Sequence, residues 1–195
     1  MRYILLVAPA RRAGPRKRKQ GDTPMAERTG VITMRGNALT LTGNPVQVGQ
    51  AAPDFTALDT GLAPRSLSEF KGKVVIVSVV PSLDTPTCDL QTRRFNAEAA
   101  GLSQDVAILT VSMDLPFAQK RWCGAAGVDQ LTTLSDHREA ALGLNYGLLI
   151  KELRLLARAV LVIDRKGVVV HQQIVPEVAD EPDYAAALAA AKAAL

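Results

Sequence analysis

The chain has 195 residues, of which 48% are apolar and only 4% aromatic, and it contains two cysteines. This length and composition suit one packed domain with a mainly aliphatic core. No apolar run approaches the roughly 18 residues that a membrane-spanning helix requires, so we expect no membrane insertion.

The net charge of +4 is unevenly distributed along the chain. Residues 1–24 hold seven of the 23 Lys and Arg and one of the 19 acidic residues, which leaves a net charge of −2 for residues 25–195. We therefore expect a disordered basic extension over 1–24, one domain over 25–195, and no nucleic-acid partner. The short apolar run Tyr3–Ala8 precedes the basic residues, the reverse of a secretory signal, so we predict a cytoplasmic protein.

The predicted elements run from a hairpin to a final helix. Alternating residues at 31–34 and 39–42 flank a turn, as in a β-hairpin. After it we expect a helical turn at 67–70, a buried strand at 74–80, a helix at 89–96 and a strand at 106–112. A helix at 116–123 closed by Gly124, a strand at 131–134 and a helical turn at 139–142 follow. The chain then forms paired strands at 159–164 and 168–174 and a helix from about Pro182. This order predicts an α/β protein with a mixed sheet covered on both faces.

The segment between the strand at 74–80 and the next helix contains the main candidate for chemistry. Thr85 suits the position that caps the helix, and Pro86 suits its first residue. Cys88 then lies in the first turn, where free backbone N–H groups and the helix dipole favour a thiolate. A cysteine in this position is expected to be a good nucleophile at neutral pH.

The two cysteines, Cys88 and Cys123, lie 35 positions apart, which excludes a C-x-x-C motif. Together with His137 and His171 they form no recognisable zinc pattern. The spacing alone leaves three interpretations open: redox catalysis, two inert buried thiols, or a structural disulfide. Such a disulfide would contribute roughly 4 kcal/mol to the free energy of unfolding. A reducing cytosol opposes the disulfide.

The motif Pro81-x-x-x-Thr85-x-x-Cys88 resembles the active-site motif of the peroxiredoxins. Four strings are similar, in the same order, to the thiol peroxidase branch, an atypical two-cysteine group: Val79–Asn96, Asp114–Gly124, Tyr146–Val160 and Ile174–Tyr184. The resemblance extends from about Gly36 to the C-terminus and implies a thioredoxin-like fold, with the N-terminal β-hairpin as an addition. Thr87 and Trp122 depart from the pattern, where Val and Phe are expected.

The resemblance implies a role for each of five residues. Cys88 would be the peroxidatic nucleophile and Cys123 the resolving thiol that closes an intramolecular disulfide. Arg158 would hold the thiolate and a peroxide oxygen together. The hydroxyl of Thr85 would either contact the peroxide or cap the helix, and Pro81 would shield the sulfur from water.

The resemblance also implies hydroperoxide substrates, thioredoxin as reductant, a homodimer, and no cofactor or metal. Because the two cysteines fall on separate predicted helices, we expect the first turn around Cys88 to unwind before the disulfide forms. A peroxide sensor or redox relay that passes oxidation to a partner protein is the alternative. Thiol–disulfide exchange on protein substrates lacks the C-x-x-C motif that it needs.

Overall fold

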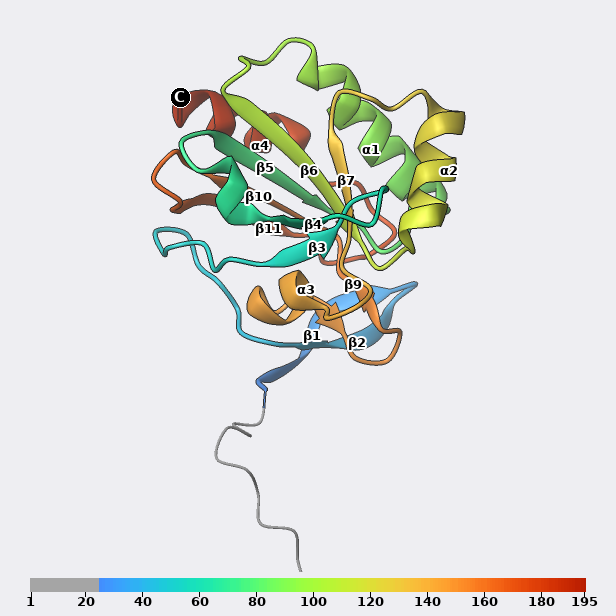
Figure 1. Cartoon of the computed structure of the whole chain (residues 1–195). Coiled ribbons are helices and arrows are strands. Elements are labelled where there is room, and N and C mark those ends of the chain that lie inside the picture. Colours follow the sequence, from blue (N-terminus) through green and yellow to red (C-terminus); the bar gives the residue numbers. More distant parts are fainter. Residues whose placement is uncertain (1–24) are drawn as a thin grey trace, which may run out of the picture.

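The computed structural model describes residues 25–195, and two β-sheets form its framework (Figure 1). The extension predicted over 1–24 lies outside the described residues. The larger sheet has seven strands in the order β11-β10-β5-β6-β7-β3-β4. Their bounds are β3 (Thr56–Leu58), β4 (Pro64–Ser66), β5 (Val74–Val79), β6 (Val106–Ser112), β7 (Thr132–Ser135), β10 (Ala159–Ile163) and β11 (Val169–Ile174).

Strands β5, β6 and β7 are parallel, and the remaining pairs of the larger sheet are antiparallel. The smaller sheet has the order β1-β2-β8-β9, with β1 (Glu27–Met34), β2 (Asn37–Thr42), β8 (Leu149–Ile150) and β9 (Leu155–Leu156). The α-helices are α1 (Pro86–Ala99), α2 (Pro116–Ala126), α3 (Ala141–Asn145) and α4 (Tyr184–Ala193), and a 3-10 turn covers Leu67–Phe70. The predicted mixed sheet and N-terminal hairpin are confirmed.

The two faces of the larger sheet pack against different elements because successive side chains of a strand point to opposite sides. Val74 and Ile76 of β5 join an apolar cluster with residues of α1 and α4. Val75 and Val77 join a second cluster with the hairpin, α3 and the smaller sheet. Every residue of β5 is therefore buried, which explains why five of its six residues are apolar.

Three details differ from the sequence prediction. Helix α2 passes through Gly124 and ends at Gly127, whose left-handed φ of 66° is the backbone conformation that glycine adopts most easily. The segment that follows α3 contains β8 and β9, and the turn between them places exposed Arg154 at a φ of 55°. Strands β3 and β4 were not predicted. In the described part of the chain, no helix is long and apolar enough to cross a membrane.

Candidate active site

Cys88 lies in the first turn of α1, as its sequence context predicts, and its side chain is completely buried. Thr85 occupies the N-cap position in an extended conformation, and Pro86 is the first helical residue. The backbone N–H of Asp89 donates to the carbonyl of Thr85 at 2.9 Å, which closes the first turn. The local signals in the sequence therefore position the sulfur at the positive end of a helix.

The hydroxyl of Thr85 caps no helix N–H and instead donates to the carbonyl of Ser82 at 3.0 Å. Thr85 thus braces the loop between β5 and α1, and its capping role is not observed. The hydroxyl of Thr87 donates to the carbonyl of Ala179 at 3.0 Å, so it ties α1 to the loop before α4. This contact gives Thr87 a structural function that the sequence did not indicate.

Arg158 lies just before β10 and is only 1% exposed. Its Nη2 is 3.4 Å from the Sγ of Cys88, its Nη1 donates to the Oε1 of Gln91 at 2.8 Å, and its Nε donates to the carbonyl of Val178 at 2.9 Å. The ion pairs found among residues 25–195 do not include it. The structure therefore places the Arg158 guanidinium beside Cys88. Its three partners are two neutral carbonyl oxygens and the sulfur.

Gln91 and Ser78 belong to the same buried cluster, and sequence reasoning did not identify either of them. Both are completely buried, and the Nε2 of Gln91 donates to the Oγ of Ser78 at 2.8 Å. Two signals were available in the sequence. Gln91 follows Cys88 by three positions and so shares its helix face, and Ser78 is the one polar residue in β5.

A pocket of about 340 Å³ opens beside this cluster. Three of the predicted site residues line it, namely Pro81, Thr85 and Arg158, together with residues of the hairpin and of the loop before α4. Pro81 is buried and Thr85 is exposed. A small molecule in the pocket would therefore contact the guanidinium that holds the Cys88 sulfur.

Cys123 lies on α2 and forms no disulfide with Cys88. Both thiols are free in the structure, and the Sγ of Cys123 is 3.5 Å from the Oγ1 of Thr133. Cys123 lines a pocket of about 260 Å³ whose lining includes Lys120 but none of the residues around the Cys88 pocket. The two cysteines share one small apolar cluster formed by Val80, Leu83, Trp122 and Val128.

Asp89 connects α1 to α2. Its Oδ1 accepts a hydrogen bond from the indole Nε1 of Trp122 at 3.1 Å, and its Oδ2 accepts one from the Nε of Arg93 at 2.9 Å. The Arg93 guanidinium also lies 5.7 Å from the centre of the Trp122 ring. Trp122 is therefore a packing residue with a polar anchor, placed between the two cysteine-bearing helices.

Asp114 holds the loop that carries Pro81 and Thr85. Its carboxylate accepts hydrogen bonds from the Oγ of Ser82 at 2.7 Å, the backbone N–H of Leu83 at 2.8 Å and the Oγ of Ser112 at 2.8 Å. These bonds connect the loop after β5 to the end of β6.

Neither histidine takes part: His137 contacts the hydroxyl of Ser135 at 2.8 Å, and His171 lies in β11, where burial lowers its pKa.

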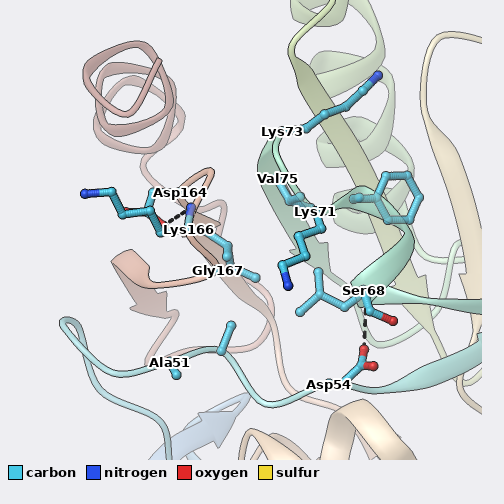
Figure 2. A pocket seen from close by; sticks show the side chains of 13 residues that line it. Ala51, Asp54, Ser68, Lys71, Lys73, Val75, Asp164, Lys166 and Gly167 are labelled. Atoms are coloured by element: carbon cyan, nitrogen blue, oxygen red, sulfur yellow. Dashed lines mark hydrogen bonds between the residues drawn. The ribbon is translucent and has the colours of Figure 1, made fainter.

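A third concave region, of about 280 Å³, lies at the other end of the sheet, where β5 begins and β10 ends (Figure 2). Its two carboxylates and the ammonium of Lys73 are engaged with backbone groups. The carboxylate of Asp54 accepts from the N–H of Ser68 at 3.1 Å, and that of Asp164 accepts from the N–H of Lys166 at 2.9 Å. It contains no cysteine, and within residues 25–195 no group of three or more potential metal-binding side chains occurs.

Comparison with known proteins agrees with this geometry. The family model described as Redoxin matches residues 47–188. The chain is 57% identical over 164 residues to the thiol peroxidase of Halalkalibacterium halodurans, covering 84% of this chain and 98% of that protein. It is 55% identical over 162 residues to the thiol peroxidase of Bacillus subtilis, covering 83% and 96%.

Among solved structures, a peroxiredoxin-like protein from Aquifex aeolicus superposes with a TM-score of 0.80 at 39% identity, covering 88% of this chain and 99% of that chain. This likeness confirms the thioredoxin-like fold. The family match, the relatives and the placement of Cys88 beside a buried arginine all agree. The chain therefore belongs to the redoxin family, in the branch of the thiol peroxidases.

Proposed function

We propose that this protein reduces hydroperoxides by thiol chemistry at Cys88. One observation supports this most directly: Arg158, buried and without a carboxylate partner, places Nη2 3.4 Å from the Cys88 sulfur beside an open pocket. A guanidinium in that place stabilises a thiolate and can also hold a peroxide oxygen. The thiol peroxidase relatives catalyse the reaction that this arrangement suits.

In the first step the thiolate of Cys88 attacks one oxygen of the hydroperoxide, and the O–O bond breaks. Cys88 becomes a sulfenic acid, and the leaving oxygen takes up a proton and departs as water or an alcohol. Negative charge moves from sulfur to the leaving oxygen during this step, so the fixed donors of Arg158 remain useful throughout. We assign to Pro81, which is buried and lines the pocket, the role of shielding the sulfur, and Thr85 braces the loop that carries Pro81.

In the second step the thiol of Cys123 attacks the sulfenic acid, a disulfide forms, and water is released. The first turn of α1 has to unwind for this to happen, because the two cysteines occupy separate helices. A thioredoxin-like dithiol then reduces the disulfide, is itself oxidised to a disulfide, and returns both cysteines to thiols. This reductant requires a reducing compartment, and we propose the cytoplasm.

We also propose a homodimer. The start of α2 presents two exposed apolar side chains, Leu115 and Phe117, which are 54% and 67% exposed. Exposed apolar side chains that lie together commonly mark an interface. Phe117→Glu should convert the dimer to a monomer in sedimentation velocity. Val48→Glu is the matched control, because Val48 is 58% exposed and its neighbour Gly49 donates its N–H to the carbonyl of Val169 in β11, at the opposite edge of the sheet. A dimer that persists in Phe117→Glu would place the interface elsewhere.

The decisive experiment is the intact mass of the reduced protein after one equivalent of cumene hydroperoxide. A loss of two hydrogens that requires both cysteines, judged with Cys88→Ser and Cys123→Ser, is the expected result. Oxidation confined to Cys88 with no disulfide in the parent protein would favour the redox relay. No reaction at either thiol would refute the peroxidase proposal.

A further inference from the structure

We propose that two side chains, Trp122 and Thr87, slow the closing of the Cys88–Cys123 disulfide by bonding the first turn of α1 in place, which prolongs the life of the Cys88 sulfenic acid. This inference rests on the proposed function and concerns its second step. The two residues are the positions at which the chain departs from the thiol peroxidase pattern, with Trp in place of Phe and Thr in place of Val. Each departure adds a hydrogen-bond donor, and the structure shows where each donor is used.

The donor that Trp122 adds reaches the first turn of α1. Its indole Nε1 donates to the Oδ1 of Asp89 at 3.1 Å, and only 9% of Trp122 is exposed. A phenylalanine ring in that place would have no such donor. The other carboxylate oxygen of Asp89 accepts from the Nε of Arg93 at 2.9 Å, which fixes the direction of the carboxylate. Because the acceptor is charged, the bond from Trp122 is stronger than one between neutral groups.

The donor that Thr87 adds reaches the loop before α4. Its hydroxyl donates to the carbonyl of Ala179 at 3.0 Å. Valine has the same branched shape but no donor, so the residue that the pattern expects could not form this bond. The first turn of α1 is therefore bonded to α2 on one side and to this loop on another.

Disulfide formation requires the first turn to move. In a disulfide the two Cβ atoms lie roughly 3.5–4.5 Å apart, whereas in the structure both thiols are free and the Cys88 sulfur lies 3.4 Å from the Nη2 of Arg158. Thr87, Cys88 and Asp89 are successive residues, and successive side chains leave a helix about 100° apart. Cys88 therefore cannot turn toward α2 without displacing both neighbours, and the two added bonds break before the sulfurs meet.

The rest of α1 is bonded to α2 and to the loop after it independently of the first turn. The Nη1 of Arg93 donates to the carbonyl of Ala126 at 2.8 Å. The Oδ1 of Asn96 accepts from the backbone N–H groups of Asp129 and Gln130 at 3.2 and 2.8 Å. We therefore expect the motion that joins the cysteines to be confined to the first turn, which is the part that the two added bonds hold.

Slow unwinding leaves the sulfenic acid open to a second reaction. In resolution the Cys123 thiol attacks the sulfenic sulfur, an S–S bond forms, the S–O bond breaks, and the hydroxyl leaves as water with the thiol proton. In the competing reaction the sulfenic sulfur attacks a second hydrogen peroxide molecule, the O–O bond breaks, water leaves, and Cys88 becomes a sulfinic acid. A contact that holds the first turn therefore shifts the products toward the sulfinic acid.

The test is the partition between these two products as hydrogen peroxide is varied in excess over the reduced protein. Intact mass separates them, because the disulfide loses two hydrogens and the sulfinic acid gains two oxygens. The peroxide concentration that gives equal amounts is expected to rise about fivefold in Trp122→Phe and about threefold in Thr87→Val, because each variant loses one hydrogen bond. The double variant should show the product, about 15-fold, because the two bonds share no partner. The rate of the first step does not enter this partition, which begins after Cys88 is oxidised.

Asp84→Asn is the matched control. Asp84 lies in the loop before α1 and faces Arg121 of α2 at 3.8 Å, but both side chains are mostly exposed, so we expect no change in the partition. If either Trp122→Phe or Thr87→Val leaves the concentration unchanged, or if Asp84→Asn raises it as much, the proposal is wrong. Thr87→Val preserves the shape of the side chain, so its result decides the question if Trp122→Phe does not fold.

A second measurement needs no hydroperoxide. The two bonds stabilise the dithiol relative to the disulfide, so in a dithiothreitol redox buffer both variants should shift the equilibrium toward the disulfide by about the same factors. If the parent protein does not react with hydrogen peroxide, the peroxidase proposal fails, whereas this equilibrium still tests the two bonds. If the parent reacts and closes its disulfide, and the variants match it in both assays, only the role of Trp122 and Thr87 is refuted.

Discussion

Replacing Asp114, which follows β6, tests whether its carboxylate holds the loop between β5 and α1 in place. Asp114→Ala removes the acceptor of the Leu83 N–H, which is almost fully buried, and of the Ser82 and Ser112 hydroxyls. The hydroxyl of Ser82 is partly exposed and can turn to water. The other two donors stay buried, and an unsatisfied buried donor costs about 1–3 kcal/mol, so we expect a loss of about 2–6 kcal/mol in the free energy of unfolding.

Asp114→Asn retains one acceptor oxygen, so we expect a smaller loss of about 1–2 kcal/mol. Denaturant titration measures both losses, and amide exchange at Leu83 reports whether the loop itself opens. Asp84→Ala is the matched control on the same loop, because its one ion pair, with Arg121 at 3.8 Å, is exposed and is expected to be worth about 0–1 kcal/mol. If Asp114→Ala loses no more stability than Asp84→Ala, and Leu83 exchange is unchanged, the carboxylate does not hold the loop.

Three further predictions concern charge and packing. Arg158→Lys should slow the reaction of Cys88 with hydrogen peroxide at least tenfold, measured by stopped flow, because one ammonium cannot reproduce the planar set of donors; an unchanged rate would exclude a role for the guanidinium. Burial raises the pKa of Asp136 to about 6, above the ordinary value near 3.9. The protonated carboxyl therefore favours the folded state, and this contribution to stability is present in full below about pH 4 and is lost as the pH rises to about 6. Relative to Asp136→Asn, the parent should therefore lose about 3 kcal/mol in unfolding free energy between about pH 4 and 7; parallel stability curves would contradict this. Trp122, the sole tryptophan, should change its fluorescence emission when the disulfide forms, and a signal that persists in Trp122→Phe would have to come from another group.

The central part of the fold could be predicted because its signals are local. The apolar run of β5 and the Thr85-Pro86 pair mark the end of a strand and the start of a helix without reference to the rest of the chain. The strands β3, β4, β8 and β9 have two or three residues each, too few to establish a period. Their turns also use positive φ at Leu62 and Arg154, where glycine or asparagine would have been the readable signal.

The candidate site divides in the same way. Cys88 could be assigned to a helix N-terminus from neighbouring residues, whereas its contact with Arg158 joins positions 70 apart and was indicated only by family resemblance. The bond from Gln91 to Arg158 and the bonds from Asp114 to the loop depend on how β5, β6 and β10 assemble. No local pattern encodes these contacts, so they became visible only in three dimensions.

The isolation of the Arg158 charge has a thermodynamic consequence for the redox cycle. When Cys88 is a thiolate, the guanidinium has a counter-ion; when Cys88 is part of a disulfide, that counter-ion is gone and the cation remains near an apolar interior. The reduced protein is therefore favoured, and we expect a reduction potential higher than that of an ordinary structural disulfide. The oxidised protein should accordingly melt at a lower temperature than the reduced protein, although it carries an additional covalent link. Such a disulfide would yield readily to a dithiol, and Arg158 would thus promote both the oxidation of Cys88 and its return to the thiol.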